Sequence, residues 1–101
     1  MALTDHIHDT EPLVFAKSLS DVRATIGSSL SVECEADGQP EPRVRWKRVT
    51  GTKTVVSEST SRALLTIASV QKSDVGEYEC EATNDMQAPI VQRISITVTG
   101  T

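Results

Sequence analysis

Apolar and polar residues alternate along most of the chain with the period of two that is typical of β-strands. The alternation is clearest where glutamates separate Val32, Cys34 and Ala36, and again further along where glutamates separate Tyr78 and Cys80. Each run has one apolar and one polar face, as expected of a strand that covers a core on one side and meets water on the other. The pattern predicts eight strands, at residues 13–17, 20–26, 28–37, 42–48, 53–56, 62–68, 76–84 and 89–98.

Turn-forming residues separate these runs, for example Gly27-Ser28-Ser29 and the proline-rich stretch at 37–42. Residues with the helical period of 3.6 do not occur between them. Strands at this spacing, without crossover helices, predict an all-β fold, either a sandwich of two packed sheets or a barrel.

The first eleven residues follow neither period, so we interpret 1–11 as a disordered leader or linker and 12–99 as the folded domain. The chain has 101 residues, 38% hydrophobic and 24% charged, which fits one globular domain. Its longest apolar runs are too short for a transmembrane helix, and its start does not follow the plan of a signal peptide. We therefore expect a module excised from a longer protein, without direct membrane insertion.

Charge and composition argue against several classes of function. The net charge of −4 has the wrong sign for a protein that binds nucleic acid by neutralising phosphates. His6 and His8 are spaced like two metal ligands, but a third and fourth donor are missing, so we expect no metal and no other cofactor. With two histidines and two cysteines, the sequence offers no pairing of nucleophile and base, and we expect no enzyme.

One constellation of residues is specific. Cys34 is followed by Trp46 after twelve residues, and a second cysteine is preceded by the run Asp74-Val75-Gly76-Glu77-Tyr78-Glu79-Cys80. With Leu65-Thr66-Ile67 between them, this set resembles the immunoglobulin superfamily, and in particular its intermediate (I-set) domains, over residues 12–98. The resemblance implies an immunoglobulin-like β-sandwich of two antiparallel sheets with seven or eight strands.

The resemblance also implies roles for individual residues. Cys34 and Cys80 lie on opposite sheets and can form a disulfide, on which Trp46 packs. Tyr78 turns its hydroxyl to the backbone of the preceding turn, Leu65 belongs to the core, and Asp74 forms a buried ion pair with Arg62. In an oxidising compartment the two cysteines form a disulfide, whereas in the cytosol they remain buried thiols, and the sequence leaves this choice open.

The spacing departs from the family in one place. Eighteen residues separate Trp46 from Leu65, about half a dozen fewer than we expect for a domain with a full strand D. We therefore predict that strand D is short or missing. One sheet should consist of the strands at 13–17, 28–37 and 62–68, and the other of those at 20–26, 89–98, 76–84, 42–48 and 53–56.

Alternation places Arg43, Arg45 and Lys47 on the outer face of one strand. Three glutamates, Glu77, Glu79 and Glu81, share the outer face of its expected neighbour, and Arg93 lies on the far side of that neighbour. We favour a self-paired, solvated ladder of charges over a heparin or nucleic-acid site. Such a charged face also disfavours the pairing through this face that antibody variable domains use. The last strand offers an alternative, an edge for added β-strands, although we expect the strand at 20–26 to cover it.

By resemblance, the chain is a non-catalytic interaction or spacer module of a multidomain protein. The family includes cell-adhesion molecules such as contactin, receptor ectodomains, matrix proteins, and intracellular muscle scaffolds such as titin. We predict an extracellular or cell-surface domain whose partner is another immunoglobulin-superfamily, adhesion or matrix protein, or a neighbouring domain. The alternative is a cytoplasmic, titin-like module of the sarcomere or cytoskeleton. The candidate binding residues lie in two exposed loops at the ends of strands: Gln39, Glu41, Asp85 and Met86.

Overall fold

The computed structural model describes residues 10–49 and 54–100. These residues form eight strands and one turn of 3-10 helix, η1, at Lys72–Asp74. All eight predicted strands are present, with ends that differ from the prediction by four residues or fewer. Their bounds are β1 Glu11–Phe15, β2 Val22–Thr25, β3 Leu30–Gln39, β4 Arg43–Arg48, β5 Thr54–Thr60, β6 Arg62–Ile67, β7 Gly76–Thr83 and β8 Ile90–Thr99.

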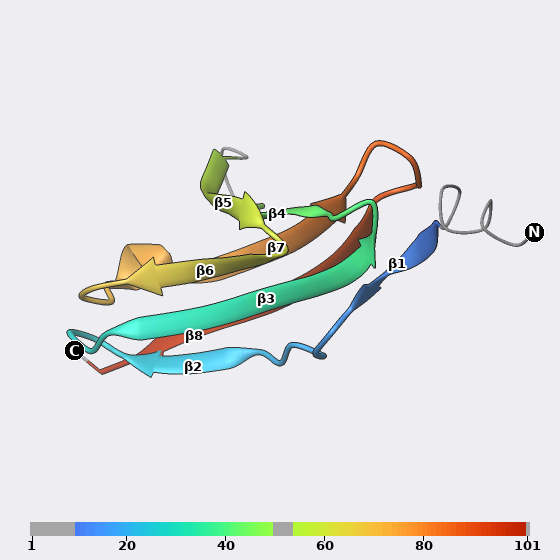
Figure 1. Ribbon diagram of the computed structural model, residues 1–101. Helices are drawn as coiled ribbons and strands as arrows, with labels where there is room; N and C mark the ends of the chain where they lie inside the picture. Colours follow the sequence, from blue (N-terminus) through green and yellow to red (C-terminus); the bar gives the residue numbers. More distant parts are fainter. Residues whose placement is uncertain (1–9, 50–53, 101) are drawn as a thin grey trace, which may run out of the picture.

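The strands build two sheets that pack face to face as an immunoglobulin-like β-sandwich (Figure 1). One sheet has the order β1-β3-β6 and is antiparallel throughout. The other has the order β2-β8-β7-β4-β5, in which β2 runs parallel to β8 and the remaining pairs are antiparallel. These are the two sheets that the sequence predicts, and the fold is therefore a sandwich rather than a barrel.

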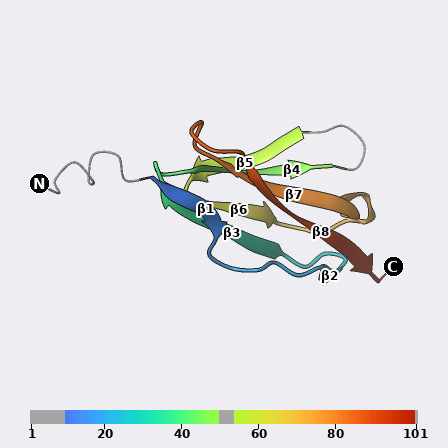
Figure 2. The ribbon, with the colours of Figure 1, turned by 90° about the vertical axis from the view of Figure 1, so that its right-hand side faces the viewer.

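Among residues 10–49 and 54–100 strand D is missing, in agreement with the short spacing. The chain leaves β5 in one sheet and enters β6 in the other through a single residue, Ser61, whose φ is +65°. Figure 2 shows β5 at the edge of its sheet. The consequence is that β5 and β6 each form an edge on the same flank of the sandwich.

The core lies between the sheets and consists of the inward-facing residues of each strand. It is made largely of small and aliphatic side chains around one aromatic pair, Trp46 and Tyr78. Eleven buried residues form one cluster: Cys34, Ala36, Val44, Trp46, Ala63, Leu65, Tyr78, Cys80, Ala82, Ile94 and Ile96. Because these are the apolar positions of the alternating pattern, the sequence period and the burial agree.

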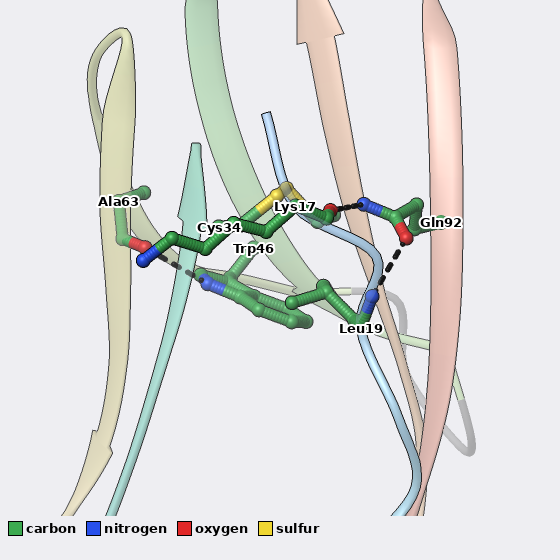
Figure 3. The surroundings of a disulfide bond; sticks show 7 residues. Lys17, Leu19, Cys34, Trp46, Ala63 and Gln92 are labelled. Atoms are coloured by element: carbon green, nitrogen blue, oxygen red, sulfur yellow. Dashed lines mark hydrogen bonds between the residues drawn. A yellow bond between two sulfur atoms is a disulfide. The ribbon is translucent and has the colours of Figure 1, made fainter. Parts of the chain in front are cut away.

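The N-terminal segment is split between the two sheets. β1 pairs with β3, and after six residues β2 pairs with β8. The side chain of Gln92 spans the crossing segment: its Nε2 donates to the carbonyl of Lys17 at 3.0 Å, and its Oε1 accepts from the N–H of Leu19 at 2.9 Å (Figure 3). One carboxylate oxygen of Asp21 accepts from the N–H of Ser95 at 2.8 Å. Side chains thus hold the segment where the regular ladder is interrupted.

The predicted leader falls mostly on residues 1–9, which lie outside the described residues. Thr10 and Glu11 are described, and β1 begins at Glu11, one residue before the predicted start of the domain.

Candidate binding surface

The disulfide joins the two sheets at their centre. Cys34 of β3 and Cys80 of β7 are bonded, with an S–S distance of 2.02 Å and 6.6 Å between their Cα atoms. Both residues are buried, as is Trp46, which lies beside the bridge (Figure 3). The indole Nε1 of Trp46 donates to the carbonyl of Ala63 on β6 at 3.1 Å, which adds a polar link between the sheets. The resemblance implied this disulfide, and it is confirmed.

Tyr78 is held at the end of β7 that lies opposite the candidate binding loops. Its hydroxyl donates to the carbonyl of Asp74 at 2.8 Å, and burial raises the pKa of this hydroxyl above its ordinary value. Arg48, the last residue of β4, lies opposite Tyr78 in the register, with its guanidinium carbon 5.6 Å from the centre of the ring. Arg48 also donates to the carbonyls of Ser73 and Val75. Two side chains therefore fix the η1 turn.

The expected ion pair between Arg62 and Asp74 is wrong. Arg62 begins β6 and pairs instead with Glu33 on the neighbouring strand, at 3.3 Å. Asp74 follows the far end of β6, and its carboxylate accepts from the N–H of Gln71 at 2.8 Å, closing the turn. Arg62 is the first residue of β6, whereas Asp74 lies in η1 beyond the last residue of that strand, so the length of β6 separates them. Sequence reasoning overlooked Arg48, the cation that does hold this turn. The signal that could have found it is the antiparallel pairing of the two strands, which places Arg48 opposite Tyr78.

The predicted charge ladder on the five-stranded sheet is present in part. Lys47 pairs with Glu81 at 3.0 Å and Arg93 pairs with Glu79 at 3.1 Å, both across neighbouring strands. These cross-strand pairs connect β4 with β7 and β7 with β8, so the face is self-paired across three strands.

The remaining two cations of this ladder pair with β5, which borders β4 on the side away from β7. Arg43 and Arg45 both bind the carboxylate of Glu58 on β5, at 2.7 Å and 3.3 Å. The hydrogen bond from Arg43 and the positive charge of both arginines hold the pKa of Glu58 below its usual value. The sequence prediction gave β5 only four residues and so missed Glu58 as a partner.

The free edge of β8 is covered where the prediction expects it. β2 pairs with β8 from Ile96 to Thr99, and the side chains of Asp21 and Gln92 occupy positions further back along β8. An added β-strand would meet these groups, so this edge is not the candidate surface.

The two predicted binding loops meet at one pole of the sandwich. The first connects β3 to β4 at residues 40–42, and the second connects β7 to β8 at residues 84–89. The side-chain amide of Asn84 donates to the carbonyl of Pro40 at 2.8 Å, and its oxygen accepts from the N–H groups of Met86 and Gln87 at 3.1 and 3.2 Å. Asn84 therefore joins the loops and shapes the second one.

Gln87 ties the same pole to the N-terminal strand. Its Oε1 accepts from the N–H of Leu13 at 2.9 Å, while its Nε2 donates to the carbonyls of Glu11 at 2.7 Å and Gln39 at 3.3 Å. Neither Asn84 nor Gln87 was singled out in the sequence as an organiser of this pole. Their amides offer both a donor and an acceptor, which is the signal that could have found them.

The four candidate binding residues, Gln39, Glu41, Asp85 and Met86, are all exposed at this pole. Met86 is the most exposed of the large hydrophobic side chains described, at 67%. Glu41 accepts a hydrogen bond from the hydroxyl of Ser61 at 3.2 Å. The surface thus combines an accessible apolar side chain with two carboxylates, on loops that the side chains of Asn84 and Gln87 hold in place.

A shallow pocket of about 380 Å³ lies beside these loops, with Glu11, Asp37 and Glu41 in its lining. Its lining is mostly polar, unlike the apolar pockets typical of small-molecule sites. Across residues 10–49 and 54–100, no group of three or more histidine, cysteine, aspartate or glutamate side chains is placed to hold a metal ion. His6 and His8 lie outside this part of the chain. Nor does any helix among the described residues have the length and apolar character needed to cross a membrane.

The two-sheet topology, the central disulfide and the tyrosine at the turn define the immunoglobulin class of β-sandwich. The sequence profile of the immunoglobulin domain family matches residues 12–84. The chain therefore belongs to the immunoglobulin domain family.

Comparison with known proteins gives similar sequences and a similar fold. The chain is 33% identical over 87 residues to Neuronal growth regulator 1 of Gallus gallus, which covers 86% of this chain and 24% of the relative. It is 40% identical over 75 residues to Contactin-1 of Bos taurus, covering 73% of this chain and 7% of the relative. A solved complex of titin M10 with an obscurin-like 1 immunoglobulin domain shares the fold, with a TM-score of 0.74 and 23% identity over 88% of this chain and 95% of that chain. The chain spans about a quarter or less of these curated relatives.

Proposed function

We propose that this domain is a non-catalytic protein-interaction module of a larger extracellular or cell-surface protein. Its sequence relatives include contactin, a cell-adhesion molecule, and Neuronal growth regulator 1. The observation that carries the proposal is the disulfide: Cys34 and Cys80 are bonded and at most 1% exposed, next to the fully buried Trp46. Structural disulfides are typical of proteins that fold in an oxidising compartment.

The redox state of the cysteines decides between this proposal and the intracellular alternative, which the solved titin M10 complex represents at the level of the fold. The folded domain is equilibrated in a glutathione buffer poised like the cytosol, denatured, alkylated and weighed. A structural disulfide has a reduction potential below about −300 mV and survives this buffer. Two alkylated cysteines in a domain that remains folded would instead favour a cytoplasmic scaffold.

The binding surface that we propose is the pole formed by Glu41, Asp85, Met86 and the exposed side chain of Gln39. Loops at the end of a rigid sandwich are where this architecture presents variable side chains to partners. Asn84 and Gln87 support this proposal because they fix both loops, so that a partner meets an ordered surface. The partner is another protein, either an immunoglobulin-superfamily or adhesion protein or a neighbouring domain.

A cell-adhesion assay tests the pole. Beads coated with the domain are scored for adhesion to a cell monolayer, with the triple variant Glu41→Ala, Asp85→Ala, Met86→Ala compared with the wild type. A matched control changes three exposed residues at the opposite pole: Lys72, Ser73 and Val75, each to alanine. Selective loss of adhesion in the first variant is the expected result. Adhesion that survives in the first variant would move the site away from this pole.

A further inference from the structure

Strand β5 is an open edge of the five-stranded sheet. Within the described residues no strand lies beyond it, because the chain passes from β5 through Ser61 directly into β6 of the other sheet. In an antiparallel pair, alternate residues point their N–H and C=O groups away from the partner strand. About half of the backbone groups of β5 therefore face the position that a further strand would occupy (Figure 2).

The other described strands that form edges carry features that discourage pairing. β1 has five residues and includes Pro12, and β2 has only four residues. β6 begins with the exposed Arg62, and the carbonyl of its next residue, Ala63, already accepts the indole N–H of Trp46. Short length, proline and charge are the means by which native proteins keep sheet edges from pairing.

β5 lacks these protections. It is seven residues long, and Thr54–Thr60 contains no proline, lysine or arginine. Val55 and Val56 are 46% and 47% exposed. Its one charged residue, Glu58, is already bound by Arg43 and Arg45 of its own sheet at 2.7 and 3.3 Å. The bulge opposite Trp46 and Lys47 is the one feature that twists this edge.

We propose that β5 pairs antiparallel with β5 of a second copy of this chain, so that one sheet continues across a symmetric dimer. A two-fold axis brings β5 of both copies together, so that the outward-facing N–H and C=O groups of each strand bond to those of the other. One register pairs the whole strand with itself. It places Thr54 opposite Thr60 of the second copy and puts Ser57 on the axis.

The charges on this flank fit that register. Glu58 lies opposite Val56 of the second copy, so the two glutamates do not face one another, which would be unfavourable. The new pair therefore sets no like charges directly opposite each other, and the repulsion between two chains of net charge −4 is screened at moderate salt.

The pairing is weak, because it buries one strand edge and no large apolar face. We expect a dissociation constant of about 0.1–1 mM, at the weak end of specific association. The far end of β5 approaches the loop pole, since Ser61 contacts Glu41. Variants at Val56, in the first half of β5, therefore test the dimer, and variants at Glu41, Asp85 and Met86 test the proposed binding function, so that the two can fail independently of one another.

Sedimentation equilibrium of the domain tests the proposal, over roughly 20 μM to 2 mM at about 0.15 M salt, where long-range repulsion is screened. The wild type should pass from monomer to dimer. Val56→Glu places a carboxylate opposite Glu58 of the second copy and should weaken dimerisation at least tenfold. Val91→Glu is the matched control, because Val91 is 46% exposed on β8. A wild type that stays monomeric throughout, or equal weakening by the two variants, would overturn the proposal.

Cross-linking tests the register. In the proposed dimer the two copies of Ser57 face each other, at a Cα separation of about 4.5–5.5 Å that a disulfide can span. Ser57→Cys should therefore form a covalent dimer under mild oxidation. The control is Ser59→Cys, whose two thiols lie two residues from the axis on either side, about 13 Å apart along the strands. Cross-linking at position 59 and none at position 57 would refute the self-pairing proposed here.

Discussion

Replacing Gln92 with alanine tests how the N-terminal segment is held. The side chain makes two hydrogen bonds to the segment between β1 and β2: it donates to the carbonyl of Lys17 and accepts from the N–H of Leu19 (Figure 3). In the wild type these bonds replace the backbone hydrogen bonds between strands, which are interrupted where the segment passes from one sheet to the other. Without them, both backbone groups must find water or remain unpaired.

The magnitude follows from the two bonds. A neutral hydrogen bond contributes about 1 kcal/mol net, so Gln92→Ala should lower the free energy of unfolding by about 2 kcal/mol. For a domain of this size, each kcal/mol lowers the melting temperature by roughly 4–8 °C, so the expected fall is roughly 8–16 °C. Gln92→Met keeps the length of the side chain and removes its hydrogen bonds, so it should lose nearly as much.

Urea denaturation of the three proteins measures the loss, and hydrogen exchange at the N–H of Leu19 locates it. If the alanine variant were as stable as the wild type within about 0.3 kcal/mol, water would be replacing both bonds and the reasoning would be wrong. A methionine variant as stable as the wild type would show that the glutamine contributes packing rather than hydrogen bonds.

Three further predictions concern other contacts. Tyr78→Phe removes the hydroxyl that donates to the carbonyl of the preceding turn, and urea denaturation should show a loss of about 1 kcal/mol. The pKa of Glu58 is lowered in the folded state, so its stabilising effect is complete above the unfolded pKa and is lost as pH falls through the folded pKa; an NMR titration should show Arg43→Ala raising that pKa. Gly38→Ala would place a Cβ 2.8 Å from Cδ2 of Leu13, and thermal unfolding should show a loss of about 1–3 kcal/mol as β1 shifts.

Much of the fold could be predicted because the core residues follow the strand period. Cys34, Trp46 and Cys80 are both the residues of the family motif and buried positions of the alternating pattern. The missing strand D was also predictable, because chain length alone limits how many strands can fit between Trp46 and Leu65.

The extent of β5 was not predictable by the same reasoning. The prediction ended the strand at residue 56, since Ser57, Ser59 and Thr60 break the apolar alternation. What extends it is pairing with β4, reinforced by two arginines that bind Glu58. Such cross-strand partners depend on register, which a pattern of apolar positions does not fix on a solvent-exposed edge.

The candidate binding surface was predicted less completely. The exposed loop residues could be placed because turn-forming residues mark the loops. The supporting amides of Asn84 and Gln87 could not, since their partners lie 44 to 76 residues away in the chain. The wrong pairing of Arg62 with Asp74 has a similar cause. It was taken from the family resemblance, and the sequence did not show that β6 separates the two residues.

The parallel pairing of β2 with β8 has a mechanical consequence. β1 begins at one end of the sandwich and β8 ends at the other (Figure 1), so tension applied through the chain pulls β2 and β8 in opposite directions along their common axis. The hydrogen bonds between them lie across the direction of pull and are loaded together in shear, rather than opened one at a time. A module joined into a longer chain at both ends would therefore resist stretching through a strand of only four residues.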